Sequence, residues 1–167
     1  WTLALCCAVL AIAGAGWIAG HATLRNSGSH ELIANVDDKS IARGALATAL
    51  ESAHMRQQVA TVDGRTIVPV VTFRNAEGQF CRQFEIADKS ATALGGYACR
   101  NSSGDWQVGF QGMGPRLATA TNPEASIPAD GAPNGNLSAA IENIISGDAL
   151  DLAGESKLIG NGWKRPS

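Results

Sequence analysis

The hydrophobic pattern begins with an uncharged, mainly apolar run over residues 1–20. A helix of that length, rising ~1.5 Å per residue, covers the ~30 Å hydrocarbon layer of a bilayer. A cleaved signal peptide is the alternative, with a cleavage site near His21, but its apolar region is usually about 7–15 residues long. The pattern therefore predicts a retained transmembrane helix over residues 1–22. A polar, turn-rich linker is predicted over residues 23–39.

Three later segments carry apolar residues at helical spacing. The first follows Ser40, which suits a helix N-cap, and ends near His54. Its apolar stripe comprises Ala42, Leu46, Ala49, Leu50 and Ala53. Asn136 is predicted to cap a helix over residues 137–146, and a short helix over residues 151–159 follows. We expect Trp163 to fold back after the glycines that end this last helix.

Four segments have the composition of β-strands, with frequent β-branched and aromatic side chains separated by turns. They cover residues 66–73, 80–88, 92–101 and 105–111. Pro69 has no amide proton, so it is expected at a sheet edge or with its missing donor directed outward.

These elements predict an α+β fold with an N-terminal transmembrane helix. A small four-stranded antiparallel β-meander packed on an α-helix follows, and two short C-terminal helices end the chain. The extracytoplasmic domain would cover residues 40–111. Residues 112–135 form a Gly/Pro/Ala-rich loop, and residues 136–167 form the C-terminal helical segment.

Cys81 and Cys99 lie in the second and third predicted strands. If the hairpin turns about residues 89–91, these cysteines are directly opposed, close enough for a disulfide with local twist. This register places a set of apolar residues on one face, because side chains alternate along a strand. The set is Phe84, Ile86, Leu94 and Ala98, which Trp106, Val108 and Phe110 are expected to join.

A redox-active cysteine pair is the alternative to a structural disulfide. Catalytic dithiols usually lie close together in sequence and near a helix N-terminus, whereas Cys81 and Cys99 are far apart on strands. The sequence therefore predicts a structural disulfide between them, in a compartment outside the reducing cytosol.

Composition argues against several functions. The net charge is -2 without a basic block, so no nucleic-acid partner is expected. The three histidines have no metal-ligand spacing, and no hydrolase, P-loop or dinucleotide motif occurs. We therefore expect no enzyme activity, and no catalytic, cofactor-binding or metal-binding residues. Because the chain begins with Trp1 rather than Met, we expect it to be a fragment.

Three short runs carry a family resemblance: TFRNAEGQFCRQFE at residues 72–85, GYACR at 96–100 and GDWQV at 104–108. With the ending over residues 141–163, they resemble the extracytoplasmic portion of bacterial transmembrane anti-sigma-factor-like proteins. The C-R…A-C-R…G-x-W pattern is also similar to small bacterial surface antigens and outer-membrane lipoproteins.

The anti-sigma-factor resemblance implies a sensing or regulatory protein that crosses the inner membrane once. Its C-terminal domain would lie in the periplasm, and membrane lipid would be a partner of the chain. A cytosolic segment before Trp1 would bind a sigma factor; the sequence identifies no periplasmic partner. The surface-antigen resemblance implies the alternative, a structural envelope protein or surface antigen domain without catalytic activity.

Overall fold

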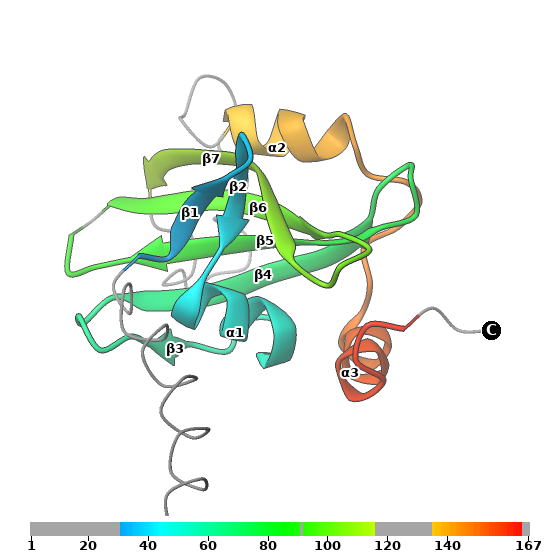
Figure 1. The fold of residues 1–167 in the computed structure, drawn as a ribbon, viewed down its shortest axis with the longest axis horizontal. Helices are drawn as coiled ribbons and strands as arrows, with labels where there is room; N and C mark the ends of the chain where they lie inside the picture. Colours follow the sequence, from blue (N-terminus) through cyan, green and yellow to red (C-terminus); the bar gives the residue numbers. More distant parts are fainter. Residues whose placement is uncertain (1–30, 91, 116–134, 165–167) are drawn as a thin grey trace, which may run out of the picture.

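The computed structural model describes residues 31–90, 92–115 and 135–164, which build one antiparallel sheet with helices on both faces (Figure 1). The sheet has seven strands in the order β1-β2-β7-β6-β5-β4-β3. The strands are β1 (Ile33–Val36), β2 (Lys39–Ala42), β3 (Val59–Ala60), β4 (Thr66–Arg74), β5 (Phe80–Ala87), β6 (Thr92–Arg100) and β7 (Trp106–Pro115). The prediction of a four-stranded meander is therefore wrong.

The predicted membrane helix at residues 1–22 lies outside the described residues. Within the described ranges, no helix has the length and apolar content needed to cross a bilayer.

Of the three additional strands, β1 lies in the predicted linker over residues 23–39, and β2 begins at the last residue of that linker and continues into the predicted helix. β1 and β2 form a tight hairpin whose two turn residues, Asp37 and Asp38, have φ of 49° and 60°. Such a pair of positive φ values is typical of the two-residue hairpin turns that match strand twist. Ser40, predicted as a helix N-cap, lies in β2 and donates a hydrogen bond to Asn35 Oδ1 (3.0 Å). The helix begins later because β2 first extends the sheet beside β7.

The predicted register of the central hairpin is confirmed. Cys81 lies opposite Cys99, Phe84 opposite Gly96, and Ile86 opposite Leu94.

The next ladder, between β6 and β7, shifts register between Tyr97 and Ala98, so that Phe110 lies opposite Tyr97. This bulge turns Phe110 to the face opposite Val108, and its predicted place in the main core is wrong. The bulge accommodates Gly109, where any Cβ would overlap the Tyr97 ring.

The helices divide between the two faces of the sheet. Helices α1 (Gly44–Ser52) and α3 (Leu152–Gly160) share one core with Phe84 and Ala98. Helix α2 (Gly135–Glu142) contacts β6 and β7 on the other face, where Leu137 packs over Gly95. The predicted apolar stripe of the first helix is buried as expected, although the helix is shorter than predicted.

The two C-terminal helices also have different bounds from those predicted. Asn136 lies inside α2, whereas Asp151 caps α3 by accepting a hydrogen bond from the Gly154 amide (2.7 Å). A left-handed turn at Gly162 (φ 62°) then directs Trp163 back onto the core, as predicted.

Residues 144–150 run along the outer edge of β4. The Ser146 amide donates to the Arg74 carbonyl, and the Leu150 amide to the Thr72 carbonyl, both at 2.8 Å. Because β3 pairs with only the first two residues of β4, this segment covers strand edge that β3 leaves open.

The loop between β3 and β4 is held by an ion pair. Arg65 Nε donates to Asp63 Oδ2 (2.8 Å), and the Thr61 hydroxyl donates to the same carboxylate. The Arg65 and Thr61 hydrogen bonds hold the pKa of Asp63 well below its usual range. The loop therefore contributes a local dependence on pH.

Candidate functional site

The structure contains a disulfide between Cys81 and Cys99, with their Cα atoms 3.9 Å apart. It joins the adjacent strands β5 and β6. Cys81 is fully buried, on the face where the Phe73 and Tyr97 rings meet edge to face at 6.4 Å. The disulfide is therefore part of the packing of this face.

Alternation along β5 places Arg82 on the opposite face, under α1. Its side chain is fully buried, and Nη1 donates to the Leu50 carbonyl at 2.7 Å and to the Ala49 carbonyl at 3.2 Å. Nη2 donates to the Ala53 carbonyl (2.8 Å). The last carbonyls of a helix have no partner within the helix, and a cation suits that end of its dipole. Arg82 thus terminates α1 from inside the protein.

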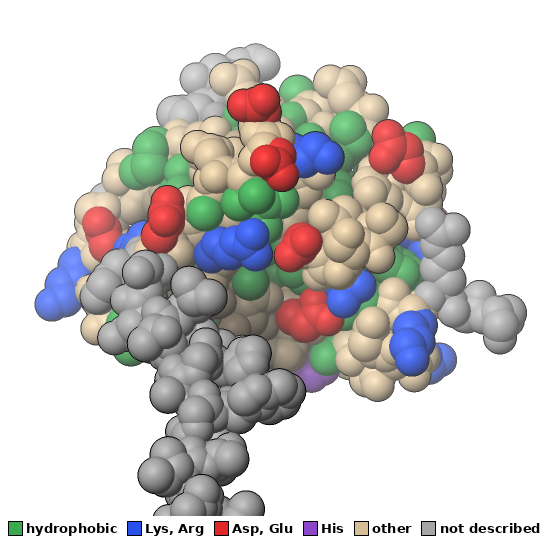
Figure 2. Space-filling model, in the orientation of Figure 1, with side chains coloured by type: hydrophobic (Ala, Val, Ile, Leu, Met, Phe, Trp, Pro, Cys, Tyr) green, Lys and Arg blue, Asp and Glu red, His purple; other side chains and the backbone are tan. Residues whose placement is uncertain are grey.

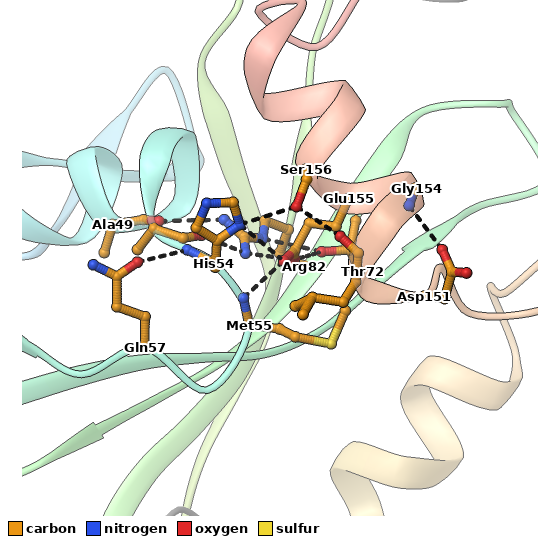
Figure 3. A network of polar contacts seen from close by, with 12 residues as sticks. Ala49, His54, Met55, Gln57, Thr72, Arg82, Asp151, Gly154, Glu155 and Ser156 are labelled. Carbon is orange, nitrogen blue, oxygen red and sulfur yellow. Dashed lines mark hydrogen bonds and ion pairs between the residues drawn. The ribbon is translucent and has the colours of Figure 1, made fainter.

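Glu155 of α3 is the counter-charge for Arg82 (Figure 3). Its Oε1 accepts hydrogen bonds from Arg82 Nη2 (2.7 Å) and the Thr72 hydroxyl (2.6 Å), and Oε2 accepts one from the Met55 amide (2.7 Å). Both charged side chains are fully buried. Desolvation lowers the pKa of Arg82, and the Glu155 carboxylate opposes this effect. The pair ties α1, the sheet and α3 together.

His54 and Ser156 lie at the edge of this network (Figure 3), where serine, histidine and a carboxylate invite comparison with a catalytic triad. His54 Nδ1 is 3.5 Å from Ser156 Oγ and 4.0 Å from Glu155 Oε2. A triad needs the nucleophile and the carboxylate on different ring nitrogens, whereas here both lie beside Nδ1. The Ser156 hydroxyl also donates to the Leu152 carbonyl (2.7 Å). The arrangement does not form a catalytic triad.

The second Cys-Arg pair, Cys99 and Arg100, also brings an arginine into contact with α1, through a carboxylate instead of backbone carbonyls. Arg100 Nε and Nη2 donate to the two carboxylate oxygens of Glu51 in α1, each at 3.1 Å. The Trp106 indole donates to the same carboxylate (2.8 Å), and the Trp163 indole to the Glu51 carbonyl (2.8 Å). The two indole rings meet edge to face at 4.9 Å. Both arginines therefore attach α1 to the sheet.

Two open surface hollows lie on either side of Arg100, with volumes of about 490 and 520 Å³. The first lies between α1 and the β6–β7 turn, where Arg43 and Asp105 approach to 3.5 Å. The second is lined by the β4–β5 and β6–β7 turns together with Phe80 and Trp163. On the face drawn in Figure 2, acidic and basic side chains are interspersed. Because the charges beside the first hollow pair with one another, its geometry does not single out a ligand.

Among the described residues, no three side chains of His, Cys, Asp or Glu lie close enough together to hold a metal ion. Of the three histidines, the structure describes His54. The buried Arg82–Glu155 pair was not predicted from the sequence.

Comparison with known proteins gives one informative finding. The model of a family described as 17 kDa outer membrane surface antigen matches residues 57–107, less than half of the chain. No curated protein and no solved structure matches the chain. The matched segment includes both Cys-Arg pairs but neither α1 nor α3.

The match supports the surface-antigen resemblance and favours a non-catalytic envelope domain. It gives no support to the anti-sigma-factor prediction. The prediction of a membrane-spanning regulator is therefore replaced by the alternative, an envelope or surface antigen domain, because the family that matches is one of surface antigens. The inner-membrane, single-pass location is likewise unsupported.

Proposed function

We propose that this chain is a non-catalytic domain of the bacterial cell envelope, similar to surface antigens. The observation that carries the proposal is the family match over residues 57–107, which includes both halves of the disulfide. That family is one of outer membrane surface antigens. Structural disulfides persist outside the reducing cytosol, which agrees with an envelope location.

The chemistry of the described polar groups supports a structural role. Arg82, Glu155, Glu51 and Arg100 are each engaged in attaching α1 or α3 to the sheet. A catalytic acid or base needs a free path to a substrate proton, whereas the Arg82–Glu155 pair is fully buried. These charges therefore hold the domain together.

Fractionation of a Gram-negative host that expresses the protein tests the location. We expect the chain in the envelope fraction, with Cys81 and Cys99 blocked to thiol-alkylating reagents until a reductant is added. A variant with both cysteines changed to serine is the matched control, because its location should not depend on the disulfide. Recovery of the wild-type protein in the cytosol with both thiols free would contradict the proposal.

A further inference from the structure

The second surface hollow has the size of a small-molecule site. Its volume of about 520 Å³ lies within the range of roughly 300–1,000 Å³ that is typical of ligand pockets. Phe80 and Trp163, each 5% exposed, contribute two aromatic rings to its lining, and these rings meet edge to face. Polar side chains supply most of the remaining lining. The hollow therefore offers hydrogen-bonding groups beside an aromatic surface.

Hydrogen bonds within the β4–β5 turn fix the orientation of one amide in the lining. The backbone amide of Gln79 donates to Asn75 Oδ1 (2.8 Å), so Asn75 must present its NH2 group on the other side. That group donates to Gln79 Oε1, also at 2.8 Å. The side-chain oxygen of Gln79 is thus used within the turn. Its NH2 group has no acceptor in the described part of the chain and lines the hollow as a donor.

The β6–β7 turn orients a second amide in the same way. Asn101 Oδ1 accepts a hydrogen bond from the backbone amide of Asp105 at 2.9 Å. The side-chain NH2 group of Asn101 is then the part of the amide that is left for other partners. Both turns therefore direct their amide oxygens to their own backbone or side chains and leave donors for a ligand.

Two cations also line the hollow. Arg100 uses Nε and Nη2 to bind Glu51, which leaves Nη1 as a further donor. Lys39 is exposed and forms no ion pair with the described residues. Glu77 is the one carboxylate among the lining residues. The available groups are therefore mainly donors, two of them charged, which favours a ligand that carries negative charge on several oxygens.

We propose that this hollow binds the phosphate monoester group of a small polar ligand, either a soluble sugar phosphate or a lipid headgroup that ends in phosphate. A phosphate monoester carries nearly two negative charges and three strong acceptor oxygens, more than the two oxygens of a carboxylate. The volume leaves room for a sugar or glycerol unit beside the phosphate, where Ser102 and Gln107 offer partners for hydroxyl groups. Binding is a property of the isolated chain, so the proposal does not depend on the envelope assignment.

A nuclear magnetic resonance titration of the full chain in a non-ionic detergent tests the proposal. The soluble probe is glucose 1-phosphate, with glucose as its uncharged control. The lipid probe is a short-chain phosphatidic acid added to the micelles, with phosphatidylcholine of the same chain length, a phosphate diester, as its control. We expect the side-chain NH2 resonances of Gln79 and Asn101 to shift with the monoesters only. The dissociation constant should be on the order of 1 mM, because partly solvated charges bind weakly.

Two substitutions at the hollow should act in opposite directions. Gln79→Glu keeps the oxygen that Asn75 requires but replaces the NH2 donor with a carboxylate oxygen, and it should weaken binding at least about tenfold. Glu77→Gln removes a negative charge from the lining and should strengthen binding about two- to fivefold. Glu142→Gln is the matched control, since Glu142 is exposed at the end of α2 and does not line the hollow. It should leave the dissociation constant unchanged.

The two probes distinguish the sources of the phosphate. A response to glucose 1-phosphate alone identifies a soluble ligand, and a response to phosphatidic acid alone identifies a headgroup; either supports the proposal. Absence of both responses well above the expected dissociation constant would overturn it. Equal effects of Glu77→Gln and Glu142→Gln would also overturn it, because they would show a general dependence on net charge. This comparison decides the matter if Gln79→Glu disturbs the turn.

Discussion

A double-mutant cycle on Arg82 and Glu155 tests whether the buried pair organises the core. Glu155→Leu removes the carboxylate and leaves the Arg82 charge unpaired under α1, where both side chains are 0% exposed. Breaking a buried ion pair in this way costs about 3–5 kcal/mol. For a domain of about 115 residues, that corresponds to a fall of roughly 12–20 °C in the unfolding midpoint.

Arg82→Met should cost at least as much as Glu155→Leu, for a different reason. Besides the ion pair, it removes the donors to the Leu50 and Ala53 carbonyls at the end of α1. Each buried acceptor left unsatisfied costs about 1–3 kcal/mol.

The double variant separates the two effects. With both charges gone the unpaired-charge penalty disappears, but the orphaned carbonyls remain. The loss should therefore be smaller than the sum of the single losses by about 1–3 kcal/mol. Urea unfolding followed by tryptophan fluorescence and circular dichroism gives the three free energies. Leu152→Ala, at a side chain 57% exposed, is the control and should change stability little. Single losses that add within about 0.5 kcal/mol would refute the coupling.

Replacing Cys81 and Cys99 with alanine should lower the free energy of unfolding by about 2–4 kcal/mol, measured by urea unfolding; unchanged stability would contradict a structural role. Gly109→Ala should cost about 1–3 kcal/mol, because its methyl group overlaps the Tyr97 ring, and thermal unfolding would show it. Asp63→Asn should lower the unfolding midpoint at pH 7. A carboxyl whose pKa is lowered by folding stabilises the protein above its unfolded pKa of about 4, and this contribution is lost as the pH falls below that value. The difference from the wild type should therefore shrink below about pH 4; a difference that stays constant from pH 7 to pH 3 would exclude the ion pair as its cause.

Gly160→Ala is the matched control for Gly109→Ala. A Cβ at Gly160 has no atom within 4 Å, and the residue lies in α3, where alanine is the better helix former. Its stability should equal or exceed that of the wild type.

The central hairpin could be predicted from the sequence because two independent signals agreed. The alternation of apolar side chains and the opposition of Cys81 and Cys99 both require the same register. The bulge at Gly109 could not be read in this way, since alternation assumes an uninterrupted strand. The prediction from alternation therefore placed Phe110 on the wrong face of the sheet.

The β1–β2 hairpin was missed because its strands are four residues long and contain Asn35, Lys39 and Ser40. The signal that could have revealed it is the Asp37-Asp38 pair between two short runs that contain β-branched residues, since aspartate tolerates the φ values of such a turn. Propensity over so few residues is weak, and pairing with β7 decides the outcome.

The Arg82–Glu155 pair joins residues 73 positions apart, so no local pattern could specify the partner. The burial of Arg82, one member of the pair, could nevertheless have been predicted from the sequence. Arg82 has the same parity along β5 as Phe80 and Phe84, which places a charged residue on the buried face. A charge at a core position predicts a buried counter-charge somewhere in the chain.

The burial of β5 on both faces has a consequence for immune recognition. Along this strand every side chain except Gln83 is buried: those of Phe80, Arg82, Phe84 and Ile86 on the side of α1 and α3, and those of Cys81, Glu85 and Ala87 on the side that carries the disulfide. β5 lies within residues 57–107, so part of the segment that most resembles a surface antigen is hidden from antibodies in the folded protein. Antibodies raised against a peptide of residues 80–87 should recognise the denatured chain and not the native one. Native epitopes are expected instead at exposed turns such as the one containing Val62, whose side chain is 85% exposed.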